Sequence, residues 1–195
     1  MRSHKKYLII ASLFMLTACS FKEAEPVNIY TLQIENVAPV SYSRYRNQTI
    51  KVSFPQTLKE KISDRMNYSY SNSERGFYQN SQWSNNLGKL LQGNFIQILD
   101  RSRLFKAVLP YASTAGEDLR LESSIFDFSH HIRGDDSFAI VSIQFSLINT
   151  DTGKLIKTKR FSYKENTTTV DAKGYVGASS RAMESLSRDL VGWLR

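Results

Sequence analysis

The sequence predicts an α+β domain in which two amphipathic helices pack on one face of a mainly antiparallel sheet. Three observations predict this fold class: short runs of β-branched and aromatic residues, two long segments with helical periodicity, and consecutive strand patterns joined by turn residues. The chain has 195 residues, of which 41% are hydrophobic and 12% aromatic, so it can build a substantial core.

The first elements of the chain are predicted strands. Residues 29–34 and 49–54 are short runs rich in β-branched and aromatic side chains. Residues 66–70 and 76–79 flank a polar segment at 71–75, and this arrangement predicts a hairpin.

Two segments carry the helical pattern, with apolar residues at steps of three and four. The first helix begins at Trp83, and the second runs from Asp171 to Leu194. The apolar positions of the first are Trp83, Leu87, Leu90, Leu91, Phe95, Ile98 and Leu99. Those of the second are Tyr175, Ala178, Ala182, Leu186, Leu190 and Trp193. Each helix therefore has one apolar face, which we expect to cover the sheet.

Strand patterns fill the sequence between the two helices. A short strand is predicted at 104–109. A longer strand beginning at Leu119 changes its apolar phase at Ile125–Phe126, where we expect a β-bulge.

Two predicted turns complete an antiparallel meander. A turn at Arg133–Asp135 leads to the alternating strand 139–147, and a turn at 150–153 leads to the strand 154–164.

The first 18 residues have the pattern of a secretory signal peptide. Arg2, Lys5 and Lys6 precede an apolar stretch at 7–16, and small residues precede Cys19. This stretch is too short to cross a bilayer core, which requires roughly 20 residues.

The segment Leu16–Cys19 resembles the lipobox of bacterial lipoproteins. The resemblance implies cleavage after Ala18, followed by a diacylglycerol thioether and an N-acyl chain on Cys19 that anchor the protein to a membrane. The alternative is a free structural cysteine beside an ordinary cleavage site, but Cys19 is the only cysteine and lies at the cleavage position. Ser20 follows it, and by analogy with enteric lipoproteins this favours the periplasmic side of the outer membrane over the inner membrane.

We therefore expect a signal peptide at 1–18, a lipidated tether at 19–27 and a single α+β domain at 28–195. Residues 1–18 hold three basic residues and no acid, so cleavage lowers the formal net charge from +8 to +5. A moderate positive charge suits a protein that faces anionic lipid headgroups. Because the chain is exported, we do not expect nucleic acid as a partner.

No pattern in the sequence predicts catalysis, a cofactor or a metal site. His130 and His131 are a conspicuous pair, but neighbours on a strand point to opposite faces and cannot hold one metal together. We expect a solvated strand end there. There is no Gly-x-Ser-x-Gly elbow and no phosphate-binding glycine loop. The sequence therefore predicts a protein that is not an enzyme.

Two groups of residues are candidates for contact with a partner. The aromatic group on the predicted hairpin would form either a partner-binding surface or part of the core: Tyr68, Tyr70, Phe77 and Tyr78. The basic group predicts contact with lipid headgroups or an acidic partner, or else an exposed strand whose charges prevent edge-to-edge pairing. Its members are Lys154, Lys157, Lys159, Arg160 and Lys164.

The order and spacing of several short motifs resemble the ABC-type transport auxiliary lipoproteins of the PqiC type along nearly all of the mature sequence. The motifs are Tyr30–Leu32, Ile50–Val52 with Pro55, Tyr78 with Trp83, Phe105–Val108, Leu121–Phe128 and Asp189–Leu194. One departure is the short, polar loop 112–118, which puts in doubt any partner contact that relatives make there.

This resemblance implies both a fold and a role. The fold would be similar to the small α+β domain at the N-terminus of TolB. The role would be that of a non-enzymatic accessory and docking subunit beneath the outer membrane. Its partners would be an inner-membrane ABC transporter and an MCE-domain protein that spans the periplasm, and together they would transport phospholipid between the membranes.

A second function stays open from the sequence. Related small α+β lipoproteins regulate cell-envelope enzymes, for example as activators of peptidoglycan synthesis. Such an activator must reach through the peptidoglycan, whereas about eight residues separate Cys19 from the first predicted strand and span roughly 30 Å at most. The short tether favours the transport accessory. The sequence leaves open whether the protein forms a homo-oligomer.

Overall fold

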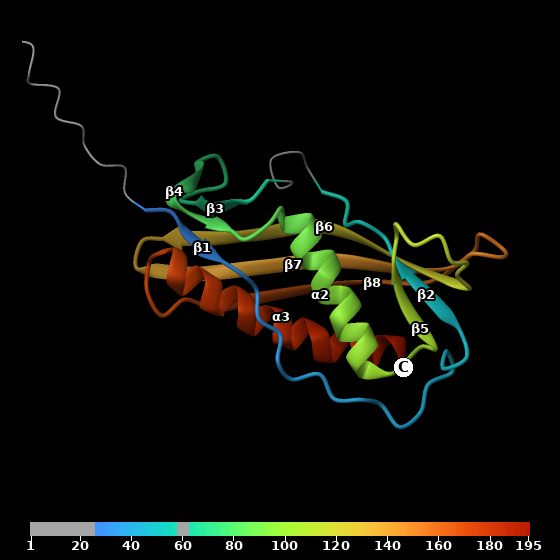
Figure 1. The fold of residues 1–195 in the computed structure, drawn as a ribbon. Coiled ribbons are helices and arrows are strands. Elements are labelled where there is room, and N and C mark those ends of the chain that lie inside the picture. Colours follow the sequence, from blue (N-terminus) through green and yellow to red (C-terminus); the bar gives the residue numbers. More distant parts are fainter. Residues whose placement is uncertain (1–25, 58–62) are drawn as a thin grey trace, which may run out of the picture.

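The computed structural model describes residues 26–57 and 63–195. In these residues one eight-stranded sheet carries two helices on one face (Figure 1). The signal peptide, Cys19 and most of the tether lie outside the described residues. The strands are β1 Asn28–Tyr30, β2 Thr49–Val52, β3 Arg65–Ser69, β4 Arg75–Trp83, β5 Ala107–Pro110, β6 Leu119–Arg133, β7 Asp136–Asn149 and β8 Leu155–Asn166. The helices are α2 Leu87–Ser102 and α3 Ala172–Leu194.

Strand β6 organises the sheet. On one side it pairs antiparallel with β7 along nearly its whole length, and β7 pairs antiparallel with β8, so the predicted meander is confirmed. On its other side β6 pairs in parallel with β2 at its start and with β3 near its end. Strand β5 extends the sheet beyond β2, whereas β4 and β1 extend it beyond β3. The sheet is therefore mixed, with long antiparallel pairings and short parallel ones.

The α+β prediction is confirmed, and both helices have capped N-termini. The Asn86 side chain accepts hydrogen bonds from the amides of Gly88 and Lys89, and the Asp171 side chain accepts one from Gly174. The predicted apolar faces point into one core formed with the inner face of the sheet, as in the edge-to-face contact of Phe95 with Phe145.

The start of the first helix differs from the prediction. Trp83 ends β4, where it pairs with Tyr30 of β1, and the helix begins four residues later. Trp83 fits the helical pattern of apolar residues because its side chain enters the same core as the helix, where it contacts Phe128 and Tyr175. The cap residue Asn86, not the apolar pattern, marks the helix start.

Three predicted strands are shorter than expected, and the one predicted at 49–54 ends at Val52. Residues 31–34 are not a strand, although Leu32 and Ile34 are buried in the core, and two hydrogen bonds join Ile34 and the segment after it to the end of α2. Arg101 donates to the carbonyl of Ile34, and Val40 donates its amide to the carbonyl of Ser102. The strand predicted at 104–109 begins at Ala107, after α2 ends in the left-handed conformation of Arg103.

The irregular positions of the meander agree with the sequence. The register of β6 against β7 shifts between Ile125 and Asp127, which confirms the predicted bulge. Gly134 and Gly153 have φ values of +60° and +65° in the two hairpin turns, where only glycine adopts the conformation without strain. The bulge also sets which residues of β6 face the open side of the sheet.

Candidate functional site

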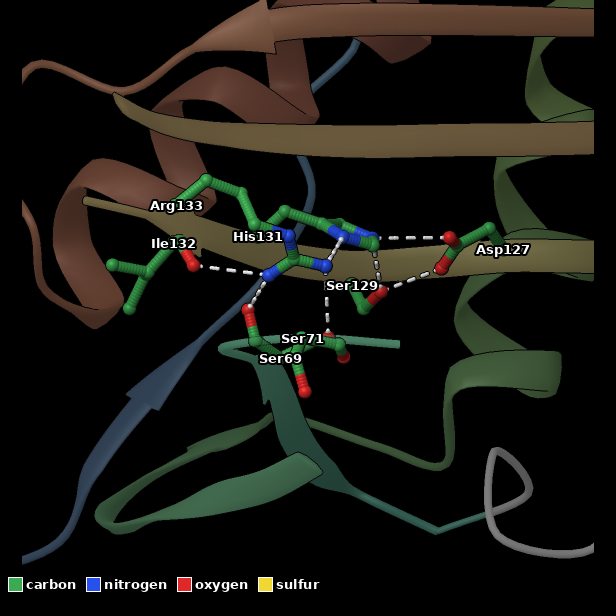
Figure 2. A network of polar contacts seen from close by, with 7 residues as sticks. All are labelled: Ser69, Ser71, Asp127, Ser129, His131, Ile132 and Arg133. Carbon is green, nitrogen blue, oxygen red and sulfur yellow. Dashed lines mark hydrogen bonds and ion pairs between the residues drawn. The ribbon is translucent and has the colours of Figure 1, made fainter. Parts of the chain in front are cut away.

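A row of four polar residues follows the bulge on the face of β6 that the helices leave open. Asp127, Ser129, His131 and Arg133 occupy alternate positions and therefore share one face (Figure 2). The Ser129 hydroxyl donates to Asp127 Oδ1 at 2.5 Å. His131 Nε2 lies 3.1 Å from Asp127 Oδ2 and 3.0 Å from Ser129 Oγ. Arg133 Nη2 lies 3.2 Å from His131 Nδ1. We call these four residues the polar row.

The polar row contains serine, histidine and aspartate, but it does not have the geometry of a catalytic triad. Arg133 can only donate, so His131 Nδ1 accepts its hydrogen bond and the imidazole proton lies on Nε2. The lone pair that a general base would need is therefore occupied. The Ser129 proton is held by the carboxylate of Asp127 instead of by an imidazole nitrogen. The row is arranged to hold the structure together.

Arg133 connects the polar row to the β3–β4 hairpin. Its Nη1 atom donates to the carbonyl of Ser69 at 2.6 Å and to that of Ile132 at 2.9 Å, and Nη2 lies 3.3 Å from Ser69 Oγ (Figure 2). The Ser69 hydroxyl in turn donates to the carbonyl of Ser71 at 2.6 Å. Only two residue pairs join β3 to β6 in the sheet, so this network supplies much of the attachment of the hairpin.

His130 lies on the opposite face of β6 and is fully buried. Its Nδ1 atom is 2.7 Å from the Tyr78 hydroxyl, its Nε2 atom is 2.7 Å from Ser137 Oγ, and its ring stacks on Tyr175 at 5.5 Å. Burial, together with the neighbouring His131, lowers the pKa of His130 to about 4. The two histidines do point to opposite faces, but the expectation of a solvated strand end is wrong for His130, because α3 covers this end of the sheet.

The aromatic group of the hairpin divides between the two faces of the sheet. The Tyr68 ring lies edge-on to Tyr70 at 5.2 Å and to Tyr78 at 5.3 Å. Tyr68 also lies over Gly76, where an added Cβ would collide with the ring. Phe77 is next to Gly76 on the strand and points to the other face, where Arg65 lies 4.2 Å from its ring centre. Burial raises the pKa of the Tyr78 hydroxyl, which belongs to the interior.

Tyr70 and Phe77 are the exposed members of this aromatic group, at 48% and 37%. Tyr68 and Tyr78 are half-buried and fix the hairpin against β6. Contact of the group with a partner stays a prediction, and it now concerns chiefly Tyr70 and Phe77.

The structure does not bring the basic group together as one patch. Lys157 donates to the carbonyl of Trp193 at 2.6 Å and lies 5.0 Å from that indole ring, and burial lowers its pKa. Arg160 lies on the open face, over Phe126 at 3.9 Å, and Lys164 lies over Phe138 at 3.8 Å.

The remaining basic residues differ again. Lys159 contacts the ring of Phe161 on the helix side, whereas Lys154 is exposed in the β7–β8 turn. Four of the five basic side chains are therefore divided between the two faces of β8, and the fifth lies in the turn before this strand. Contact with headgroups or an acidic partner is a prediction that the structure leaves to experiment.

The sequence reasoning missed a cavity of about 420 Å³ on the open face, beside the start of β6. Its lining includes Tyr111, Arg120 and Glu122. The loop 112–118 contributes to this region through Glu117, which forms an ion pair with Lys51 at 2.8 Å and with Arg120 at 2.5 Å. The hydrogen bonds that Glu117 accepts in these ion pairs lower the pKa of its carboxyl group, and the bond from Arg120 has the larger effect.

The polar row was also missed, although a signal for it exists. After the bulge at Ile125, polar residues occupy every second position of β6 from Asp127 to Arg133, and this alternation indicates that one face of the strand is not covered by the core.

Within residues 26–57 and 63–195, no cluster of three or more His, Cys, Asp and Glu could hold a metal ion. No helix in the described part of the chain is long and apolar enough to cross a membrane.

The structure is a mixed sheet that is covered by two helices on one face and carries the polar row and the cavity on the other. The chain belongs to the family of ABC-type transport auxiliary lipoprotein components, whose model matches residues 30–191.

Solved structures share this fold. Protein XCC0632 from Xanthomonas campestris has a TM-score of 0.76 at 18% identity, with 85% of this chain and 94% of that chain covered. A second, uncharacterized protein has a TM-score of 0.64 at 15% identity, with coverage of 88% and 100%. The hypothetical protein CT253 from Chlamydia trachomatis has a TM-score of 0.52 at 8% identity, with coverage of 76% and 98%. Comparison with curated proteins gives no match.

Proposed function

We propose that the protein is the accessory and docking subunit of an MCE-type transport system that moves phospholipid between the inner and outer membranes. In this proposal acyl chains on Cys19 hold it on the periplasmic side of the outer membrane. There it docks an MCE-domain protein that spans the periplasm from an inner-membrane ABC transporter. The observation that carries the proposal is the family match across residues 30–191.

The tether supports a position close to the membrane. Eight residues between Cys19 and β1 span roughly 30 Å at most. The described chain begins beside β1, at the same end of the sheet as the β3–β4 hairpin, the β6–β7 turn and the loop before α3 (Figure 1). We call this the entry end, and the opposite end, with the β7–β8 turn and residues 111–116, the far end.

The length of the sheet separates the two ends. Strand β6 has 15 residues and extends about 50 Å at roughly 3.3 Å per residue. If the entry end stays at the membrane, the far end extends into the periplasm, where a spanning partner arrives. Tyr111 and Leu155 are exposed there, at 57% each. They are the first positions at which we expect contact with the partner.

The test is photo-crosslinking of the lipidated chain in living cells, with probes at Tyr111 and Leu155 and a control probe at the exposed Lys173, in the first turn of α3 at the entry end. We expect capture of an MCE-domain protein from the far end and not in the Cys19→Ala variant, which should lose acylation and its place at the membrane. Capture of a peptidoglycan synthase without any transporter component would instead support the alternative role as a regulator of a cell-envelope enzyme.

A further inference from the structure

Exposed large apolar side chains occur on each of three segments that meet at the entry end. Tyr70 and Phe77 belong to the hairpin, Val170 precedes α3, and Val27 and Ile29 lie where the described chain begins. Val170 is 61% exposed and Ile29 is 64% exposed. Tyr70 and Val170 line one hollow together with Tyr68, Tyr78 and Ile132. The entry end thus presents an apolar surface in two parts, with Tyr70 and Val170 around one hollow and Phe77 on the other face of the sheet.

The course of the chain indicates what this surface meets. Cys19 precedes the first described residue, Pro26, by seven positions, which span roughly 25 Å at most. An acylated Cys19 lies at the bilayer surface, so the entry end is held within that distance of lipid. We infer that the entry end lies against the bilayer, with Tyr70, Phe77 and Val170 seated at the membrane–water interface. This inference rests on the lipid anchor of the proposed function.

The chemistry of the surface suits an interface between lipid and water. Tyrosine places a ring among apolar groups and its hydroxyl in water, and it is enriched at this depth of membranes. Arg65 lies over the Phe77 ring, so its guanidinium can reach a phosphate while the ring contacts acyl chains. Acidic side chains at Glu74, Asp135 and Asp136 and basic ones at Arg75 and Lys173 also belong to this end, so charges of both signs are present there. The contact therefore depends on apolar insertion, and added salt should not abolish it.

The hairpin presents its exposed aromatic rings from a fixed position. Arg133 attaches β3 to β6 on the open face, and the Tyr78–His130 hydrogen bond attaches β4 on the helix face. A pre-ordered surface loses little conformational freedom when it meets the bilayer. Because the acyl chains already provide anchoring, the contact would set the orientation of the domain, with the far end directed away from the membrane.

The experiment uses the lipidated mature protein in vesicles of phosphatidylethanolamine and phosphatidylglycerol. Since the thioether consumes Cys19, one introduced cysteine is the only free thiol and takes an environment-sensitive fluorophore. The test positions are Tyr70→Cys and Val170→Cys. Leu155→Cys is the matched control, because it is a comparably exposed apolar residue at the far end. We expect a blue-shifted emission and several-fold stronger quenching by nitroxide lipids at the two test positions than at Leu155.

Each result bears on the inference. Quenching that is equal at all three positions, or absent at Tyr70 and Val170, overturns it. A probe at Tyr70 that becomes shielded only at high protein density, without lipid quenching, assigns the surface to a second copy of the chain and also overturns it. Cellular crosslinks from the far end to an MCE-domain protein would leave the proposed function intact in either case. A second variant, Phe77→Ser, should reduce quenching at Val170, whereas Tyr111→Ser should not.

Discussion

His130 and His131 are adjacent in sequence and have opposite surroundings. His130 faces the helices, where it is buried, neutral and hydrogen bonded to Tyr78 and Ser137. His131 faces the open side, where it lies between Asp127 and Arg133. The difference shows that β6 attaches the hairpin in two ways: through the packed core on one face and through surface polar contacts on the other. These two attachments should differ in strength.

The largest expected effect follows from removing the buried histidine. His130→Ala leaves a cavity and removes the partner of two half-buried hydroxyls, so we expect the free energy of unfolding to fall by about 3 kcal/mol. His131→Ala should cost about 1 kcal/mol, since its partners can turn to water. Urea denaturation of both variants measures the difference. Equal losses would contradict the contrast between the two faces.

Acid should act through the same histidine. The unfolded chain takes up a proton on His130 near pH 6.5, whereas the folded chain does so only near pH 4. Below pH 6.5 the unfolded state therefore binds more protons, and stability falls as the pH decreases towards 4, by at most about 1.4 kcal/mol per pH unit. Above pH 6.5 this histidine contributes no pH dependence.

Denaturant titrations at pH 7, 6 and 5 test this pH dependence. His130→Gln should have a flatter profile, because glutamine does not titrate. An unchanged slope in that variant would show that other groups cause the acid sensitivity.

A smaller effect is expected from the open face. Arg133→Met removes the donors to Ser69 and His131, and we expect a loss of about 2 kcal/mol in unfolding free energy. Amide hydrogen exchange should accelerate in β3 and in the start of β4, while β7 stays protected. The control is Lys106→Met, at an exposed position. Uniform acceleration across the sheet would mean that Arg133 supports the whole fold instead of the hairpin.

The smallest effect should come from Ser129. Ser129→Ala removes one hydrogen bond to Asp127, so we expect less than about 1 kcal/mol of destabilisation and unchanged crosslinking to the partner. A small loss of stability with unchanged crosslinking supports a structural role for the polar row. Loss of cellular function in a stably folded Ser129→Ala protein would point to chemistry at this residue.

The sequence predicted most of the fold because most elements carry a strong local signal. The meander, its bulge at Ile125 and the second helix have clear alternation, turn glycines or a cap residue, and they form as expected. The predicted element boundaries were wrong where an apolar side chain is buried in the core but its backbone is not part of the predicted helix or strand. Trp83 continues a helical period from a strand, and Leu32 and Ile34 are buried without forming one.

The candidate surfaces were predicted less well, because they depend on which face of the sheet each side chain points to and on whether a helix packs over that face. The five basic residues between Lys154 and Lys164 are close in sequence but separate onto the two faces of β8 and the turn before it, and the four hairpin aromatics divide between two faces. The polar row and the cavity at Arg120 depend on the register of β6 against neighbours far away in sequence.

The sequence by itself determined the fold class, the family and the expectation of a lipid anchor, since these depend on residue types at fixed spacings along the chain. Only the tertiary structure decided that His130 is buried beneath the helices while His131 lies on the open face of the sheet. It also decided that Tyr70, Val170 and the start of β1 lie at the same end of the sheet. The physical reason is that burial and proximity arise from strand register and helix packing between distant segments, which local periodicity does not encode.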